Sequence, residues 1–363
     1  MRGRSMSARA EDVAGRREPP ERRLQPGLAA PLSILAILVN SLCAQTSEFI
    51  ADTMPTPSCH ASTIVEVKPG ELMAAWFGGS AEGKPDVAIW ASRRLNDRWQ
   101  TPVELVREPN IATYNPVLFR SGDGVLWLYY KFGPSPREWT AGRLFSLDDG
   151  RTWSAPEHLA AGLYGPIRAK PLVLPGGLIV SGTSVESYHS WAAWIERSID
   201  NGKTWARYGP IESPAANGGT ADATHGIIQP SMVQVEGKHL RLYARSTNTI
   251  GHICVADSLD DGVTWTKARA IDLPNPNSGI DALHLKDGRF VMIYNHTTQG
   301  RTPLNLAMSS DGEHWTPFHA LETDPGEYSY PAMIQGSDGS LHITYTWRRV
   351  RIKYVNWPLA NVR

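Results

Sequence analysis

The sequence predicts an all-β protein, a six-bladed β-propeller of four-stranded antiparallel blades. Two observations predict this fold: one eight-residue motif occurs three times, and one hairpin pattern occurs six times. The motif, S-x-D-x-G-x-T-W, occupies Ser146–Trp153, Ser198–Trp205 and Ser258–Trp265. Asp and Gly suit a tight turn, Ser and Asp can bond to the backbone of that turn, and Trp can be buried beside it. We therefore expect each copy, called a box below, to be a clamped turn between two strands.

Two weaker copies extend the repeat. Ser92–Trp99 keeps the first and last residues of the motif, and Met308–Trp315 keeps its Gly and Trp, with Asp311 shifted by one position. The five tryptophans stand at positions 99, 153, 205, 265 and 315, so the intervals are 54, 52, 60 and 50 residues. A repeat of this length that contains several short strands is typical of a propeller blade.

Each repeat also contains a hairpin, in which a polar residue opens an inner strand and an apolar second strand returns after a Gly-bearing turn. The inner strands are expected at 60–65, 115–119, 170–174, 229–233, 278–283 and 330–334, and the second strands at 72–77, 125–130, 178–181, 240–244, 290–294 and 341–346. Six hairpins predict six blades. The last blade has a third strand at 352–357, and we expect Glu48–Asp52 to supply its fourth strand and close the ring.

The composition is that of a globular protein with a substantial core: 363 residues, 41% hydrophobic, and a formal net charge of zero. Because there is no basic excess, nucleic acid is not an expected partner. Residues 1–30 are Arg-rich and polar. They indicate either a leader or a start codon placed too far upstream, with Met6 as another candidate.

A short apolar stretch at 31–44 is typical of a secretory signal peptide that ends near Ala44. It is too short to span a bilayer, and a buried helix is the alternative interpretation. We therefore expect a leader and signal peptide at 1–44 and a propeller domain at 45–363, secreted or periplasmic, with no membrane span in the mature chain. Cys59 and Cys254 remain after cleavage, so one disulfide is possible.

In a propeller the inner strands line a central channel, so their first residues meet at one mouth. These residues are His60, Asn115, Lys170, Gln229, Ser278 and Tyr330, and the second strands end around them at 77–79, Lys131, 184–186, Arg245, 295–296 and 347–348. A channel mouth is polar in any case, but Lys, Arg, Glu, Gln, His and Tyr in one cup favour a functional pocket. The boxes lie at the opposite, outer edge, where we expect them to be structural clamps.

The boxes and the six-blade count resemble those of the sialidase (neuraminidase) superfamily over about residues 55 to 357. The resemblance is more specific for the fold than for the activity. Propellers with such boxes also serve other glycosidases, lyases and pure binding proteins.

The resemblance implies three arginines that hold the carboxylate of the substrate, since the planar guanidinium donates two parallel hydrogen bonds. Arg245 ends a second strand as the second of these arginines does, and Arg301 resembles the third. Where the family has its first arginine, this sequence has His60, which could bind an anion when protonated or act as an acid or base. The triad is therefore incomplete.

The resemblance also implies a nucleophilic tyrosine paired with a glutamate. Tyr330 matches by its place at a strand start and Tyr328 by its Tyr-Ser motif. Gln229 stands where the glutamate belongs, and an amide cannot be a base, so Glu186 or Lys170 is left to activate the tyrosine.

The general acid of the family is an aspartate in the loop after the first hairpin, here 78–86. Glu82 and Asp86 are the candidates, although Asp86 could equally be a turn-closing residue. Asn277, in a turn that feeds the channel, is a plausible ligand of a sugar hydroxyl. The expected ligand-binding residues are therefore His60, Asn115, Lys170, Glu186, Gln229, Arg245, Asn277 and Arg301, and the expected catalytic residues are Glu82, Asp86, Tyr328 and Tyr330.

We expect an exported sialidase-like glycoside hydrolase of the exo-α-sialidase type, acting on glycans with an acidic sugar. The alternatives are a uronic-acid-specific glycosidase or lyase on the same propeller, or a non-catalytic carbohydrate-binding propeller. A carboxylate close to Arg245 and Arg301 favours catalysis over binding alone. No spacing indicates a metal site, and we expect no cofactor and a monomer.

Overall fold

The computed structural model describes residues 45–217 and 223–359, and its regular structure is almost entirely β-strand. A short 3-10 turn at Pro175–Gly177 is the one helical element among the described residues. The all-β class predicted from the sequence is confirmed. The expected signal peptide lies outside the described residues. Within the described part, no helix has the length and apolar character needed to cross a membrane.

The first two sheets each follow the chain from an inner to an outer strand. The first contains β2 (Ser58–Lys68), β3 (Glu71–Gly79), β4 (Ala88–Leu95), β5 (Arg98–Trp99) and β6 (Val103–Val106), in which both β5 and β6 pair with β4. The second contains β7 (Thr113–Arg120), β8 (Leu126–Phe132), β9 (Thr140–Ser146) and β10 (Glu157–His158).

The third sheet combines two such groups of strands. The first group is β11 (Leu172–Val173), β12 (Ile179–Glu186), β13 (Ser190–Ser198) and β14 (Ala206–Tyr208), and the second is β15 (His225–Glu236), β16 (His239–Ser246), β17 (His252–Ser258) and β18 (Arg269–Pro274). A parallel contact joins them, in which Ser190 and Trp191 of β13 stand opposite His225 and Gly226 of β15. The described strands therefore form five hydrogen-bonded sheets, where the sequence predicted six blades.

The last two sheets complete the order. One contains β19 (Asp281–His284), β20 (Phe290–Asn295), β21 (Leu304–Ser309) and β22 (Thr316–Glu322). The other contains β23 (Tyr328–Gln335), β24 (Leu341–Trp347), β25 (Arg351–Trp357) and, from the far end of the chain, β1 (Thr46–Phe49), which pairs with β25 in antiparallel fashion. The predicted N-terminal strand is thus present, two residues earlier than the expected start at Glu48.

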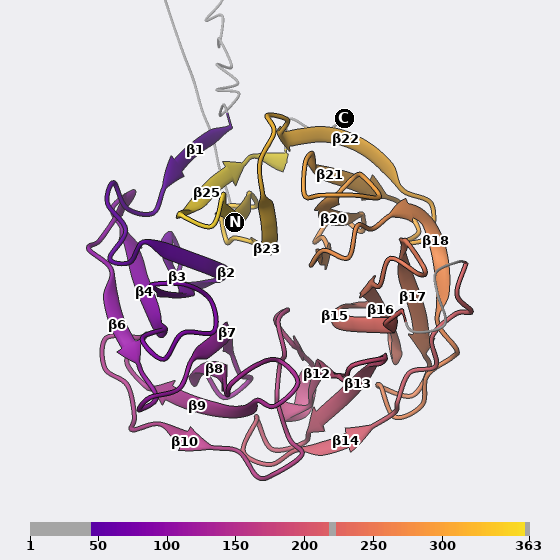
Figure 1. Ribbon diagram of the computed structural model, residues 1–363, viewed down its shortest axis with the longest axis horizontal. Helices are drawn as coiled ribbons and strands as arrows, with labels where there is room; N and C mark the ends of the chain where they lie inside the picture. The colour runs from indigo at the N-terminus through magenta and orange to yellow at the C-terminus, as the bar shows by residue number, and fades with distance from the viewer. Residues whose placement is uncertain (1–44, 218–222, 360–363) are drawn as a thin grey trace, which may run out of the picture. The chain divides into compact units, whose positions relative to one another are not determined.

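Within residues 45–359 the sheets follow one another around a ring, with β2, β7, β15 and β23 toward its middle (Figure 1). The first and last sheets are neighbours, because β2 contacts both β7 and β23. Apolar side chains of β2 and β3, such as Ile64 and Trp76, share a buried cluster with Ile352 and Tyr354 of β25. The core therefore lies between successive sheets.

Two inner strands are shorter than the sequence predicts. β11 is limited to Leu172 and Val173, because Gly176 and Gly177 turn the chain with positive φ angles of 79° and 83°. Before β19, the side chain of Asn275 binds both the amide and the carbonyl of Ser278, at 3.2 and 2.9 Å, and so holds a turn. Lys170 and Ser278 therefore precede their strands.

The boxes are clamped turns at the ends of β9, β13 and β17, as predicted. In the second box, Ser198 Oγ donates to Asp200 and accepts from the amide of Gly202 at 2.8 Å. Asp200 also accepts hydrogen bonds from the amide and hydroxyl of Thr204, at 2.9 and 2.7 Å. Tyr129 of β8 then donates to the carbonyl of Gly202 at 3.1 Å, which fixes the box to the preceding sheet.

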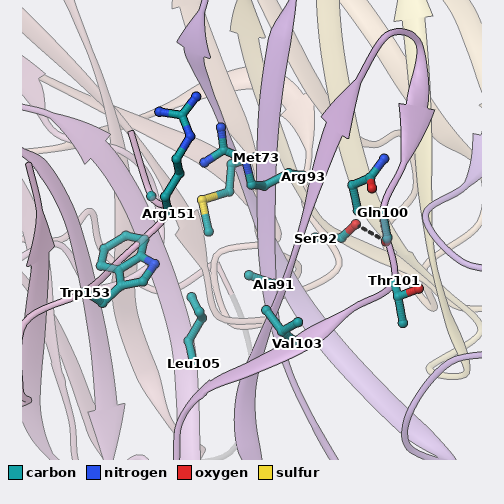
Figure 2. A pocket seen from close by; sticks show the side chains of 11 residues that line it. Met73, Ala91, Ser92, Arg93, Gln100, Thr101, Val103, Leu105, Arg151 and Trp153 are labelled. Atoms are coloured by element: carbon teal, nitrogen blue, oxygen red, sulfur yellow. Dashed lines mark hydrogen bonds between the residues drawn. The ribbon is translucent and has the colours of Figure 1, made fainter. Parts of the chain in front are cut away.

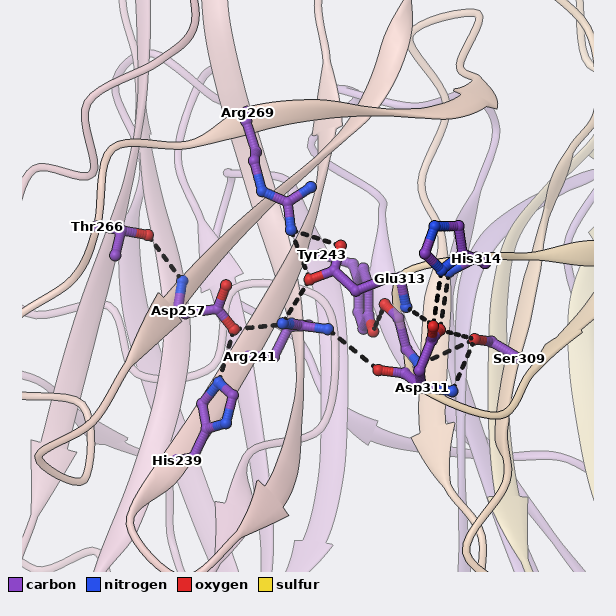
Figure 3. A network of polar contacts seen from close by, with 11 residues as sticks. His239, Arg241, Tyr243, Asp257, Thr266, Arg269, Ser309, Asp311, Glu313 and His314 are labelled. Carbon is purple, nitrogen blue, oxygen red and sulfur yellow. Dashed lines mark hydrogen bonds and ion pairs between the residues drawn. The ribbon is translucent and has the colours of Figure 1, made fainter.

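The last, weaker box keeps the same clamp one residue out of register. Ser309 Oγ donates to Asp311 at 2.9 Å and accepts from Gly312. Beside it Arg241 of β16 binds Asp257 at 2.7 Å and Glu313 at 2.6 Å (Figure 3). This ion-pair network ties the fourth sheet to the strands before it, and its groups satisfy one another.

The two cysteines do not form the disulfide that the sequence allowed. Cys59 and Cys254 are both free and buried, and burial raises the pKa of each thiol to about 12. They are therefore unreactive core residues rather than a covalent link.

Candidate active site

Four inner strands carry a β-bulge near their first residues. The residues at the bulges are Ala61, Asn115, Gln229 and Tyr330, with φ angles of 54°, 39°, 53° and 50°. The strand register skips there, for example between Ser329 and Ala332 on β23. Residues other than Gly rarely take a positive φ, and such strain is found at functional sites. The bulges re-aim the side chains at the strand starts.

The centre of the site is the hydroxyl of Tyr330. Arg245, at the end of β16, donates to it through Nη1 at 2.8 Å, and the amide of Gln229 donates to it at 3.3 Å. Arg245 also donates to the Gln229 oxygen at 3.2 Å, and to Asn277 through Nε at 2.7 Å. These four predicted residues are thus brought together. Asn277, however, faces the arginine with its side-chain oxygen.

Three guanidinium groups surround the ring of Tyr330. The Cζ atoms of Arg168, Arg301 and Arg245 lie 5.2, 5.6 and 5.8 Å from the ring centroid. Burial acts to raise the pKa of the Tyr330 phenol, but the charges of Arg245 and Arg301, with the hydrogen bond from Gln229, lower it below 10.0. We call Tyr330 and these three arginines the tyrosine–arginine cluster.

His60 lies against this cluster as a neutral ring. Its centroid is 4.3 Å from that of Tyr330, and its Nδ1 is 3.0 Å from the hydroxyl of Thr346. Burial and then the charges of Arg349, Arg301, Arg168 and Arg245 hold the pKa of His60 well below 6.5. The neighbouring arginines therefore disfavour the protonated imidazole that anion binding by His60 would require.

Glu327 links Arg301 to a further arginine, Arg349. Glu327 accepts from Arg301 Nη1 at 2.9 Å and from Arg349 Nε at 2.8 and 3.0 Å. Arg349 also pairs through Nη1 with Glu82. Arg349, Glu327 and Arg168 were missed by sequence reasoning, because none stands at a predicted strand start or matches a family motif.

Glu186 is a carboxyl of raised pKa near Arg245. It ends β12 opposite Trp191 of β13 and is half-buried, and its carboxylate makes no hydrogen bond with another described residue. Burial raises its pKa to about 7, against the opposing charges of Arg245 and Arg137. A carboxyl of this pKa exchanges its proton at neutral pH. The charge of Arg245 acts on Glu186, whereas the carboxylate in direct contact with the Arg245 and Arg301 pair is Glu327, on Arg301.

The structure gives the two predicted acids of the first loop other partners. Asp86 accepts hydrogen bonds from the amide and hydroxyl of Ser80, at 2.8 and 2.9 Å, and these lower its pKa. It is exposed and closes its own loop, so the turn-closing interpretation of Asp86 is the one the geometry favours. Glu82 is ion-paired with Arg349, as described above.

Three further predicted residues lie outside the cluster. Tyr328 is 1% exposed and packs in the core beneath the last sheet, with Arg348 3.3 Å from its hydroxyl. Lys170 is paired with the buried Asp281 at 2.7 Å. Asn115 is buried at the bulge of β7, and no hydrogen bond of its side chain to a described residue is recorded. Tyr330 rather than Tyr328 therefore faces the arginines.

A separate cavity of about 150 Å³ lies beside the first box and does not belong to this site. Met73, Ala91, Leu105 and Trp153 give it an apolar lining, with Arg93 and Arg151 beside them (Figure 2). None of the residues of the tyrosine–arginine cluster lines it.

An all-β chain with clamped box turns and an arginine-rich cluster around a tyrosine defines a class, the sialidase-like β-propeller proteins. Residues 70–343 match the family described as BNR repeat-like domain, and the chain belongs to that family, within the sialidase superfamily. It is also similar to a sialidase of Bacteroides fragilis, with 28% identity over 212 residues. That match covers 52% of this chain and 36% of the relative, so the chain corresponds to about a third of that protein.

Solved structures share the fold at low identity. The NanB sialidase of Streptococcus pneumoniae is 12% identical, with a TM-score of 0.69 over 85% of this chain and 69% of that one. A protein of unknown function from Dyadobacter fermentans is 15% identical, with a TM-score of 0.69 over 86% of this chain and 99% of that one. The agreement with these two structures concerns the fold alone.

Proposed function

We propose that this chain is a glycoside hydrolase of the exo-α-sialidase type, acting on glycans that end in a carboxylated sugar. The observation that carries the proposal is the Tyr330 hydroxyl, held by Arg245 with the guanidinium of Arg301 over the same ring. A phenol of lowered pKa beside two guanidiniums combines a nucleophile with carboxylate-binding groups in one place.

In this mechanism Arg245 and Arg301 bind the carboxylate, and Tyr330 and Glu186 carry out the two chemical steps. First the Tyr330 phenolate forms a bond to the anomeric carbon, while the bond to the leaving oxygen breaks and Glu186 gives that oxygen its proton. Then the Glu186 carboxylate takes a proton from water, whose oxygen bonds to the anomeric carbon as the Tyr330 oxygen leaves. Both residues return to their starting protonation states.

No glutamate in the described part of the chain stands beside Tyr330 to accept its proton, but the neighbouring donors and positive charges favour the phenolate. Gln229 cannot accept the phenol proton, but its amide donates to the phenol oxygen and so favours the phenolate. The arginines act in the same direction. The phenol proton therefore goes to solvent before the substrate reacts, and no side-chain base is required in the first step.

We also propose the finer architecture and location that the sequence predicts. β11–β14 and β15–β18 form two blades that touch through two residue pairs, which gives six blades in all. We propose a monomer, secreted or periplasmic after cleavage near Ala44, without cofactor or metal. The first strand, β1, begins at Thr46, two residues after this position.

Two alternatives have an observation in their favour. A non-catalytic carbohydrate-binding propeller is favoured by Gln229, because an amide opposite the tyrosine removes the usual base. A uronic-acid-specific glycosidase or lyase is favoured by His60, because an imidazole stands where sialidases have their first arginine, with its ring centroid 4.3 Å from that of Tyr330.

Hydrolysis of fluorogenic glycosides by the purified protein separates these functions. The proposal expects release of the fluorophore from a sialyl glycoside, and loss of that activity in Arg245→Ala. Cleavage of uronyl glycosides alone would overturn the sialidase assignment. If both substrates stay intact while a carboxylated sugar binds, the binding protein is the correct interpretation.

A further inference from the structure

We infer that Arg349 is a third carboxylate-binding residue of this site, and that Glu82 occupies it as an internal competitor until the carboxylate of a ligand displaces it. The inference rests on the proposed function, because it concerns the same anionic ligand. Arg349 lies in the turn between β24 and β25. It would supply the carboxylate-binding charge that His60, at the start of β2, lacks.

Arg349 is fixed next to the start of β2. Its carbonyl accepts a hydrogen bond of 2.9 Å from the amide of Cys59, the residue before His60. Four arginines lower the pKa of His60 by their charge, and the effect of Arg349 is the largest of the four. The guanidinium of Arg349, from the last sheet, therefore lies near the start of β2 in the first sheet, where His60 stands in place of an arginine.

The guanidinium of Arg349 has one anchored edge and one exchangeable edge. Its Nε donates to both oxygens of Glu327, at 2.8 and 3.0 Å, and Glu327 also orients Arg301. Its Nη1 pairs with Glu82, and its Nη2 has no recorded partner in the described part of the chain. The outer edge can thus take a carboxylate in the bidentate manner that suits arginine.

Glu82 is held weakly enough to be displaced. It lies in the exposed loop 80–86, whose base is closed by Asp86 on Ser80, and Arg349 is the one recorded partner of its carboxylate in the described structure. An ion pair this exposed contributes little. A ligand carboxylate that several guanidiniums hold at once competes well against it.

The turn between β24 and β25 fixes the backbone of Arg349. The amide of Val350 donates to the carbonyl of Trp347 at 3.2 Å, and Arg348 and Arg349 between them have the positive φ angles, 53° and 58°, that a tight hairpin turn of this kind requires. Arg349 therefore starts from a fixed backbone position beside the start of β2.

Binding of N-acetylneuraminic acid and of glucuronic acid to the full chain, measured by titration calorimetry, tests the inference. We expect Arg349→Met to raise the Kd of the bound sugar about tenfold, the effect of one charge-assisted hydrogen-bonding group. Arg349→Lys, which keeps the charge without the fork, falls in between. Arg348→Met, the adjacent arginine without a carboxylate partner in the described contacts, serves as the matched control and leaves the Kd unchanged.

Substitution of Glu82 is expected to change the Kd in the opposite direction. Glu82→Gln removes the competing charge and is expected to lower the Kd roughly threefold to tenfold. In the Arg349→Met background it has no effect, so the two changes are non-additive. Because Glu82 is exposed, its variant is expected to fold, and Glu82→Ala with the same thermal midpoint gives a second measurement.

The outcomes separate this inference from the proposed function. If the sugar binds and Arg245→Ala abolishes binding, but Arg349→Met or Glu82→Gln leaves the Kd unchanged, the inference is wrong and the carboxylate site stands. If the unmodified protein binds neither sugar, both are wrong. Tighter binding by Glu82→Gln that persists without Arg349 also overturns it.

Discussion

The boxes and the tyrosine–arginine cluster use charge in opposite ways. In each strong box the aspartate is satisfied by its own turn: Asp200 meets Ser198 and Thr204, and its pKa falls to about 2. Around Tyr330, arginines from the end of β16 and from two loops gather, and the pKa shifts are in Tyr330 and Glu186, the groups that could react. The boxes are therefore complete without a ligand, whereas the cluster holds an excess of cations that an anion would neutralise.

Removal of the Tyr330 hydroxyl is expected to have the largest effect on activity. Tyr330→Phe is expected to lower kcat/KM on a sialyl glycoside by a factor of at least about 10³, because the nucleophile is lost. Tyr328→Phe, in the core of the same strand, is the matched variant and should retain activity within about twofold. Equal losses in the two variants would show that the strand rather than the hydroxyl matters.

Removal of the titrating carboxyl comes next. Glu186→Gln is expected to lower kcat by roughly 10²–10⁴, the contribution of one general acid or base. Activity requires the Tyr330 phenolate, whose pKa is lowered, together with protonated Glu186, whose pKa is raised to about 7. Activity therefore falls on the acid side as the phenolate is lost, and on the alkaline side as protonated Glu186 is lost.

A pH–rate profile of the unmodified protein and of Glu186→Gln checks this assignment. The alkaline decline should vanish in the variant, because the amide has no proton to lose. A profile unchanged in shape would remove Glu186 from the mechanism.

A substitution within a box should lower the stability of the protein and leave its catalytic activity unchanged. Ser198 is buried, and Ser198→Ala leaves the amide of Gly202 without its acceptor. We expect a loss of about 1–2 kcal/mol in the free energy of unfolding, measured in urea, with kcat/KM unchanged per folded molecule. A loss of kcat/KM in the folded variant would contradict the separation of the two regions.

The smallest expected effect is the acid sensitivity of the boxes. The pKa values of Asp200 and Asp260 are each lowered to about 2 by hydrogen bonds within their turns, although burial opposes the shift. Their contribution to stability is therefore present above the unfolded value near 3.8 and is lost as the pH falls toward 2. Asp260→Asn should flatten the decline of the thermal midpoint slightly between pH 4 and 2.

The sequence predicts much of the fold because its signals are local. The box clamp depends on residues two to four positions apart, and the hairpins depend on strand patterns and Gly turns, so both are found where expected. The short β11 and β19 are not predicted, since the Asn275 turn depends on a side chain that folds back on its own backbone.

The site is predicted less completely because its geometry depends on contacts between sheets. Counting the predicted strands finds Tyr330, Gln229 and Arg245. These residues stand at the starts of inner strands or at the end of a second strand, and these ends meet at one edge of the sheets. It misses Arg349 and Arg168, whose places result from a turn and a loop. It also cannot show that Lys170 is paired with Asp281.

The pairing of β1 with β25 has a consequence for how the chain reaches this structure. β25 is flanked by β24 on one side and by β1 on the other, so without β1 its outer backbone groups would be unpaired. An unpaired strand edge is a template for another chain. The four residues Thr46–Phe49 thus act as an edge cover, and a chain trimmed past them, or caught before its last strand is made, exposes a surface for self-association.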